Sequence, residues 1–120
     1  MARTRNSAKA AGTRAETAVA NYLRNRGFPH AERRARTGSK DQGDISGLLG
    51  GVIEVKDCAR LELASWLAEA TTEQANAGAW WSAVWHKRKG SSSPASWYVT
   101  LTGETFAALL AAAYTQENAS

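Results

Sequence analysis

Gly43-Asp44-Ile45-Ser46-Gly47-Leu48-Leu49-Gly50-Gly51-Val52-Ile53-Glu54-Val55-Lys56-Asp57 is the stretch that decides how this 120-residue chain folds. Apolar residues occur in both halves of the stretch, and a pair of glycines separates the halves. This pattern predicts two short strands joined by a tight hairpin, in which Gly50-Gly51 supplies the positive φ angles of the turn. The two strands would lie side by side in one sheet, so each side chain can be assigned to a face.

Side chains of the predicted hairpin alternate between the two faces of the sheet. Glu54 and Lys56 are two residues apart and therefore share a face. If Leu48 lies opposite Val52, Asp44 falls opposite Lys56 on that same face, whereas a register one residue longer would place Asp44 on the wrong face. We expect the first register, because it gathers two carboxylates and an ammonium group within a few ångströms.

These three charged groups have the chemistry of a metal-dependent hydrolase. Two carboxylates on adjacent strands can hold a hard divalent cation through oxygen ligands, and Mg²⁺ is the expected ion. Such an ion lowers the pKa of a bound water and polarises a phosphoryl oxygen. A neighbouring lysine can position or deprotonate that water, or stabilise charge on a phosphate. The alternative is a half-exposed strand whose charged side chains simply face water.

The composition indicates a single domain that handles a polyanion. A chain of 120 residues holds one hydrophobic core, no apolar run approaches the length of a membrane span, and the single cysteine, Cys58, fits a reducing cytoplasm. Residues 1–40 carry ten Lys or Arg and two acidic residues, whereas residues 41–120 carry five basic and nine acidic residues. A basic first third beside an acidic segment suits a nucleic-acid substrate. A solubilising basic tail is the alternative.

Periodicity along the chain predicts an α/β fold with one folded domain. Residues 1–11 are expected to form a flexible basic arm, residues 12–114 the domain, and residues 115–120 a frayed end. Apolar periodicity and turn residues predict helices at 12–26, 61–78 and 103–114, two strands within 43–57, and further strands at 30–36, 79–87 and 95–101.

Two polar residues on predicted helices are further candidates for the site. Glu16 borders the buried face of the first helix, so it could be a metal ligand or a neighbour of one; a solvated carboxylate near the helix N-terminus is the alternative. Gln74 belongs to an otherwise apolar stripe with Leu63, Leu67 and Ala70. A buried amide needs hydrogen-bond partners, so Gln74 either reaches the lysine or a phosphate, or is exposed at the helix end.

Basic and hydroxyl side chains that could contact phosphates gather in the N-terminal third and in the loop after the strand at 79–87. For that loop, a solvated turn is the alternative. The predicted DNA contacts are Arg3, Arg5, Lys9, Arg14, Arg33, Arg34, Arg36, Ser39, Lys40, Lys87, Arg88 and Lys89.

The arrangement Asp-x9-Glu-x-Lys at Asp44, Glu54 and Lys56 resembles the PD-(D/E)xK nuclease superfamily. With Gly12-x3-Glu16, the helix carrying Gln74, and the order helix, strand, strand, strand, helix, strand, strand, helix, residues 12–110 are similar to the archaeal-type Holliday junction resolvases, including versions carried by bacteriophages. Gly43 stands where many members have proline, which supplies no metal ligand.

The resemblance implies a restriction-endonuclease-like fold, a mixed central sheet of about five strands flanked by helices in the order αβββαββα. It implies a cytoplasmic homodimer, in the host cytoplasm if a phage encodes it, that hydrolyses four-way DNA junctions with Mg²⁺, or Mn²⁺ in its place, and without a membrane or a small-molecule cofactor. The acidic catalytic positions match Glu16, Asp44 and Glu54, the catalytic lysine matches Lys56, and the backbone carbonyl of Val55 is a further expected metal ligand.

Two other functions remain open at this point. A nicking, mismatch or restriction-type nuclease would keep the fold and the chemistry but act on a different DNA. A non-catalytic DNA-binding module would rely on the basic surface and the aromatic strands alone. Two carboxylates facing a polyanion argue against the second alternative, because they would weaken binding without a metal.

Overall fold

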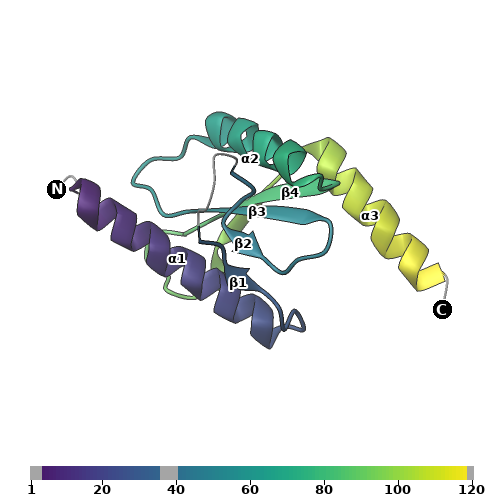
Figure 1. The fold of residues 1–120 in the computed structure, drawn as a ribbon, viewed down its shortest axis with the longest axis horizontal. Helices are drawn as coiled ribbons and strands as arrows, with labels where there is room; N and C mark the ends of the chain where they lie inside the picture. Colours follow the sequence, from purple (N-terminus) through teal and green to yellow (C-terminus); the bar gives the residue numbers. More distant parts are fainter. Residues whose placement is uncertain (1–3, 36–40, 119–120) are drawn as a thin grey trace.

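The computed structural model describes residues 4–35 and 41–118, which form an α/β arrangement of three α-helices and five strands (Figure 1). The elements in chain order are α1 (Arg5–Asn25), β1 (Glu32–Arg33), β2 (Ile45–Ser46), β3 (Gly51–Lys56), α2 (Leu63–Ala77), β4 (Trp81–His86), the 3-10 helix η1 (Pro94–Ser96), β5 (Tyr98–Thr100) and α3 (Gly103–Asn118).

The five strands form two sheets, where the sequence predicts one central sheet. β1 and β2 form a short antiparallel pair, and β3, β4 and β5 form a mixed sheet with β4 in the middle. β3 runs parallel to β4, from the Gly51–Trp81 pair to the Lys56–His86 pair, whereas β5 runs antiparallel to β4. A parallel pair requires a crossover, and α2 provides it between β3 and β4.

The predicted hairpin register is wrong. β2 pairs with β1, and the Asp44 amide donates to the Ile53 carbonyl at 2.9 Å, so Asp44 lies beside the middle of β3 rather than opposite Lys56. Gly50 has the expected positive φ of 72°, but Gly51 does not. Gly51 belongs to β3, and a Cβ there would lie 1.8 Å from the Trp81 ring. The second glycine is therefore explained by close packing on the neighbouring strand.

Helices cover both faces of the mixed sheet (Figure 1). One core cluster joins α1, through residues such as Val19 and Leu23, to Ile53 and Val55 of β3. The other cluster lies under α2 and consists of Trp66, Ala70 and Val84, with Leu67 packed against it. The odd-numbered residues Ile53 and Val55 thus face α1, as the alternation predicts, and Glu54 is left on the α2 side.

Two helices are longer than predicted. α1 begins at Arg5 because the Thr4 hydroxyl accepts a hydrogen bond from the Ser7 amide at 3.1 Å, which caps the helix. Residues 5–11 are therefore helical, and the expectation of a flexible arm is wrong for them. α3 continues to Asn118, so residues 115–118 of the expected frayed end are helical.

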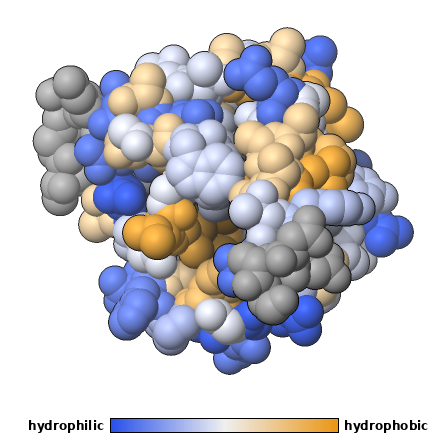
Figure 2. Space-filling view, turned by 90° about the vertical axis from the view of Figure 1, so that its right-hand side faces the viewer, coloured by the Kyte–Doolittle hydropathy of each residue, from blue (hydrophilic) through white to orange (hydrophobic). Residues whose placement is uncertain are grey.

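α3 extends away from the rest of the molecule and leaves large apolar side chains exposed (Figure 1). Phe106, Leu110 and Tyr114 are all more than two-fifths exposed, and Leu109 is only partly buried. The end of the molecule seen in Figure 2 carries hydrophobic patches between hydrophilic side chains. In the part of the chain that the structure describes, no helix is long and apolar enough to cross a membrane.

Candidate active site

Asp44, Glu54 and Lys56 converge beside β3, and we call them the strand triad. The Glu54 and Lys56 side chains meet directly, with Glu54 Oε2 at 3.2 Å from Lys56 Nζ. Asp44 reaches them from the segment before β2, where its Oδ2 accepts a hydrogen bond from the Val55 amide at 2.7 Å and its carboxyl group contacts Glu54. The structure therefore brings together the three residues that the sequence selects, although through a different register.

Burial distinguishes this triad from a solvated row of charges. Glu54 is 3% exposed, and its Oε1 has no hydrogen-bond partner among the described residues. A buried carboxylate oxygen without a partner is energetically costly. A divalent cation would satisfy it, because carboxylate oxygens are the ligands that Mg²⁺ and Ca²⁺ prefer. The geometry thus fits a metal held by Asp44 and Glu54.

Three more carboxylates adjoin the triad, and sequence reasoning missed them. Asp41, Glu69 and Glu73 each offer an oxygen within 4.8 Å of the others, and we call this group the α2 acidic cluster. Glu69 Oε1 lies 2.7 Å from Lys56 Nζ, so the cluster and the triad share that ammonium group.

The helical pattern did contain a signal for the α2 acidic cluster. The predicted stripe runs through Leu63, Leu67, Ala70 and Gln74, whereas the residues that α2 buries are Trp66, Ala70 and Glu73. Ala70 is buried as predicted, and Trp66 and Glu73 lie one position before Leu67 and Gln74, with the i, i+4, i+7 spacing of one helix face. An acidic residue on a stripe that carries the only tryptophan of the helix indicates a buried carboxylate.

Burial is the main cause of the raised pKa values of three carboxylates in this site. Burial raises the pKa of Glu54 to about 11, and the charge of Asp44 adds to the shift. Burial likewise raises the pKa of Glu73 to about 8, with Asp41 contributing. For Asp44, burial raises the pKa against the opposing effects of Glu54, the Val55 amide and Lys56. Without a cation, the site therefore holds protons at neutral pH.

The pKa of Lys56 is also raised, which for a lysine favours the charged form. Burial lowers the pKa of Lys56, but the hydrogen bond to Glu69 and the charge of Glu54 outweigh burial and hold that pKa above its ordinary value. The side chain is therefore an ammonium at neutral pH, a donor and a positive charge rather than a base.

These pKa shifts predict that the metal-free protein loses stability as pH rises. Between about pH 4.5 and pH 8 the folded state keeps the Glu73 proton that the unfolded chain has released, so rising pH favours unfolding. Each pKa unit corresponds to about 1.4 kcal/mol. In EDTA we expect the melting temperature to fall by several degrees from pH 5 to pH 9, and the Glu73→Gln variant to show a flatter profile. A wild-type profile that is flat or rises over this interval would contradict the shifts.

Glu16 of α1 lies beside β1, the strand that pairs with β2. Its Oε1 pairs with Arg33 Nε at 3.0 Å, and its side chain is 16% exposed. Arg33 is the strand partner of Ile45, the residue after Asp44. The ion pair therefore joins α1 to β1, and direct metal ligation by Glu16 stays a prediction.

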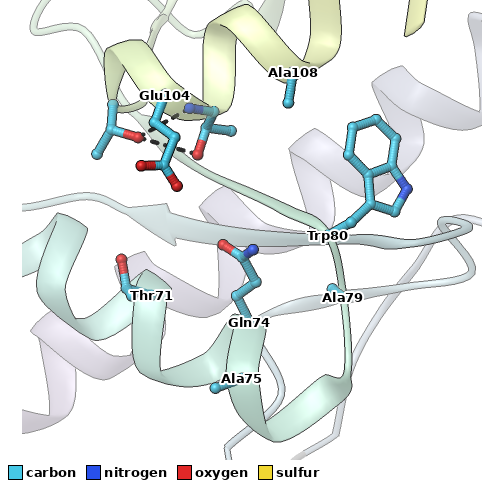
Figure 3. Close-up of a pocket in the computed structure, with 9 residues that line it drawn as sticks. Thr71, Gln74, Ala75, Ala79, Trp80, Glu104 and Ala108 are labelled. Atoms are coloured by element: carbon cyan, nitrogen blue, oxygen red, sulfur yellow. Dashed lines mark hydrogen bonds between the residues drawn. The ribbon is translucent and has the colours of Figure 1, made fainter.

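Gln74 occupies a separate pocket between α2 and α3. Its Oε1 accepts a hydrogen bond from Ser82 Oγ at 2.7 Å. The pocket has a volume of about 470 Å³, and Figure 3 shows Gln74, Trp80 and Glu104 around it. Glu73, the residue before Gln74 on α2, belongs to the α2 acidic cluster instead. The Gln74 amide thus lies on the α3 side of α2. A role for Gln74 in catalysis stays a prediction.

The predicted DNA contacts that the structure describes are mostly exposed. Lys87 begins the loop after β4, where its amide donates to the Lys56 carbonyl at 2.8 Å, so this basic loop starts beside the triad. Arg34 is partly buried, and its Nη1 donates to Gln42 at 3.4 Å. The exposed members are Arg5, Lys9, Arg14, Arg33, Lys87, Arg88 and Lys89. Arg3, Arg36, Ser39 and Lys40 lie outside the described residues.

Comparison with protein families, curated proteins and solved structures finds no match to this chain. The functional assignment therefore depends on the geometry and chemistry of the residues themselves.

Proposed function

We propose that this chain is a Mg²⁺-dependent endonuclease with a restriction-endonuclease-like fold, and that it cuts branched DNA. One observation carries the proposal: the buried Glu54 carboxylate, with an oxygen that lacks a partner, lies between the Asp44 carboxylate and the Lys56 ammonium. Two carboxylates and a lysine in this arrangement supply a cation site and a positive charge beside it, which phosphodiester hydrolysis uses.

Each member of the triad has a distinct role in the proposed reaction. Asp44, Glu54 and the Val55 carbonyl would hold the ion, which supplies a water of lowered pKa and polarises the phosphate. The Val55 amide keeps Asp44 oriented through the 2.7 Å hydrogen bond. Lys56, as an ammonium, orients the attacking water and stabilises the charge that develops on the phosphate oxygens.

The basic side chains support DNA as the substrate. Lys87, Arg88 and Lys89 are exposed and follow β4 at the end where Lys56 closes β3. A phosphate backbone lying on this loop would pass close to the triad, and binding through such contacts weakens steeply with salt. We also propose that two copies associate, because Phe106, Leu110 and Tyr114 of α3 are exposed apolar side chains. A symmetric pair could cut two strands at a junction.

The test is cleavage of a synthetic four-way junction with Mg²⁺ and with EDTA, beside a plain duplex of the same sequence. We expect cleavage only with Mg²⁺, preference for the junction, and loss of cleavage in Asp44→Asn with junction binding retained. Binding without cleavage under every metal condition would contradict the proposed enzymatic activity and favour a non-catalytic DNA-binding module. Equal cleavage of the duplex would keep the chemistry and reject the junction preference.

A further inference from the structure

We propose that the α2 acidic cluster, Asp41, Glu69 and Glu73, is a second divalent-cation site beside the strand triad. Its three oxygens come from the segment before β2 and from one face of α2, and they lie within 4.8 Å of one another. No residue of this cluster belongs to the strand triad, which the proposed function uses. The cluster adjoins the triad through the Lys56–Glu69 pair, so variants of Asp44 and of Glu73 are needed to tell the two sites apart.

Glu73 points to a ligand independently of the clustering. Its side chain is 1% exposed, and neither carboxylate oxygen has a hydrogen-bond partner among the described residues. A carboxylate buried in this way is destabilising unless a proton or a cation compensates it. No donor group among the described residues occupies either oxygen, so both can coordinate an ion, as a bidentate or bridging ligand would.

The spacing of the cluster fits an oxygen-ligated ion. Two oxygens on opposite sides of a Ca²⁺ ion are about 4.6 to 5.2 Å apart, and on Mg²⁺ about 4.0 to 4.2 Å. The three oxygens lie within 4.8 Å of one another, so they could meet on one ion after a small closure of the cluster. Glu69 can make such a movement, because its side chain is 41% exposed.

Neighbouring residues hold Asp41 toward α2. The Gly43 amide donates to Asp41 Oδ1 at 2.9 Å, and the Asn76 side chain donates to the Asp41 carbonyl at 2.9 Å. The segment that leads into Asp44 is thereby fixed to the helix that carries Glu73. A cation in the cluster would strengthen this link, since it would join the two elements through their side chains.

The charges of the whole site call for more than one cation. When all groups are ionised, the described residues of the triad and the α2 acidic cluster carry a net charge of −4, from five carboxylates and one ammonium: Asp41, Asp44, Glu54, Glu69, Glu73 and Lys56. One divalent cation would leave a net charge of −2 in a largely buried site, whereas two would neutralise it. Charge balance thus agrees with the spacing and with the unpartnered Glu73.

The test counts Mn²⁺ ions bound to the DNA-free protein, by equilibrium dialysis and electron paramagnetic resonance. We expect two ions per wild-type chain, one in Glu73→Gln, one in Glu69→Gln, and two in the matched control Glu62→Gln, an exposed carboxylate at the start of α2. Circular dichroism establishes that each variant is folded. If Glu73→Gln fails to fold, Glu69→Gln decides the outcome.

The outcomes separate this site from the proposed function. One ion per wild-type chain that Asp44→Asn loses and Glu73→Gln keeps would overturn the second site and leave the triad intact. One ion that Glu73→Gln loses and Asp44→Asn keeps would support the α2 acidic cluster and remove the metal from the proposed nuclease site. Two ions retained by both Glu73→Gln and Glu69→Gln would also overturn the proposal.

Discussion

Glu54→Gln is expected to reduce junction cleavage by at least about 10³-fold, which corresponds to about 4 kcal/mol of transition-state stabilisation. Glutamine keeps the shape of the side chain but removes the charge that would hold the cation beside Asp44 and Lys56. The measurement is a single-turnover cleavage rate with Mg²⁺, together with junction affinity from a gel-shift titration in Ca²⁺. We expect the affinity to change by less than about twofold, because Glu54 is 3% exposed and presents no surface to DNA.

The same substitution is expected to stabilise the metal-free protein. Burial and the neighbouring Asp44 raise the pKa of Glu54 to about 11, so the folded state keeps a proton that the unfolded chain releases, and a neutral amide removes that cost. Above pH 8 and in EDTA, Glu54→Gln should melt at a higher temperature than wild type. Glu62→Gln, which removes an exposed carboxylate just before α2, serves as the control and should change neither cleavage nor melting. A fully active Glu54→Gln variant would end the proposed mechanism.

Gly47→Ala is expected to destabilise the protein by about 3 to 5 kcal/mol. Gly47 has a φ of 84°, and a Cβ at this position would lie 1.8 Å from the His30 carbonyl oxygen. The obstacle is backbone, so no side-chain rotation can relieve it. Urea unfolding followed by tryptophan fluorescence measures the change, and a variant too unstable to fold would agree with the expectation.

Gly78→Ala provides the matched control for this prediction. Gly78 ends α2 with a φ of 64°, and nothing lies within 4 Å of its Cβ position. The substitution therefore carries only the cost of left-handed backbone, about 1 kcal/mol. If Gly47→Ala proved as mild as Gly78→Ala, the close approach of the segment after β2 to His30 would be wrong, and with it the placement of Asp44.

The candidate site could be predicted from sequence where local alternation sufficed. Glu54 and Lys56 share a strand face because side chains alternate every second residue, whatever the strand pairs with. The register of Asp44 could not be obtained this way. The Gly50-Gly51 pair favours a hairpin locally, but Gly51 packs against Trp81 as part of β3. Ile45 and Ser46 pair with β1 instead, and the segment before them contacts β3 through the Asp44 amide and the Ile53 carbonyl, which shifts Asp44 from the hairpin register.

The helices, too, could be predicted from local sequence only in part. Gly27 follows the end of α1 as its position predicts, but the beginning at Arg5 depends on a single cap by Thr4. On α2, the apolar pattern allows two adjacent stripes. Burial of Trp66 against Val84 of β4 selects the stripe that turns Glu73 inward and Gln74 toward α3. Packing therefore decided which polar residue of this helix joins the site.

The sequence alone determined the α/β class, the basic first third, and the shared face of Glu54 and Lys56, because these depend on composition and on the two-residue period of a strand. Only the tertiary structure decided that Asp44 reaches this face through the Val55 amide, and that Asp41, Glu69 and Glu73 stand beside it. The reason is physical: contacts between segments far apart in the chain depend on which surfaces exclude water together, and no local period records that choice.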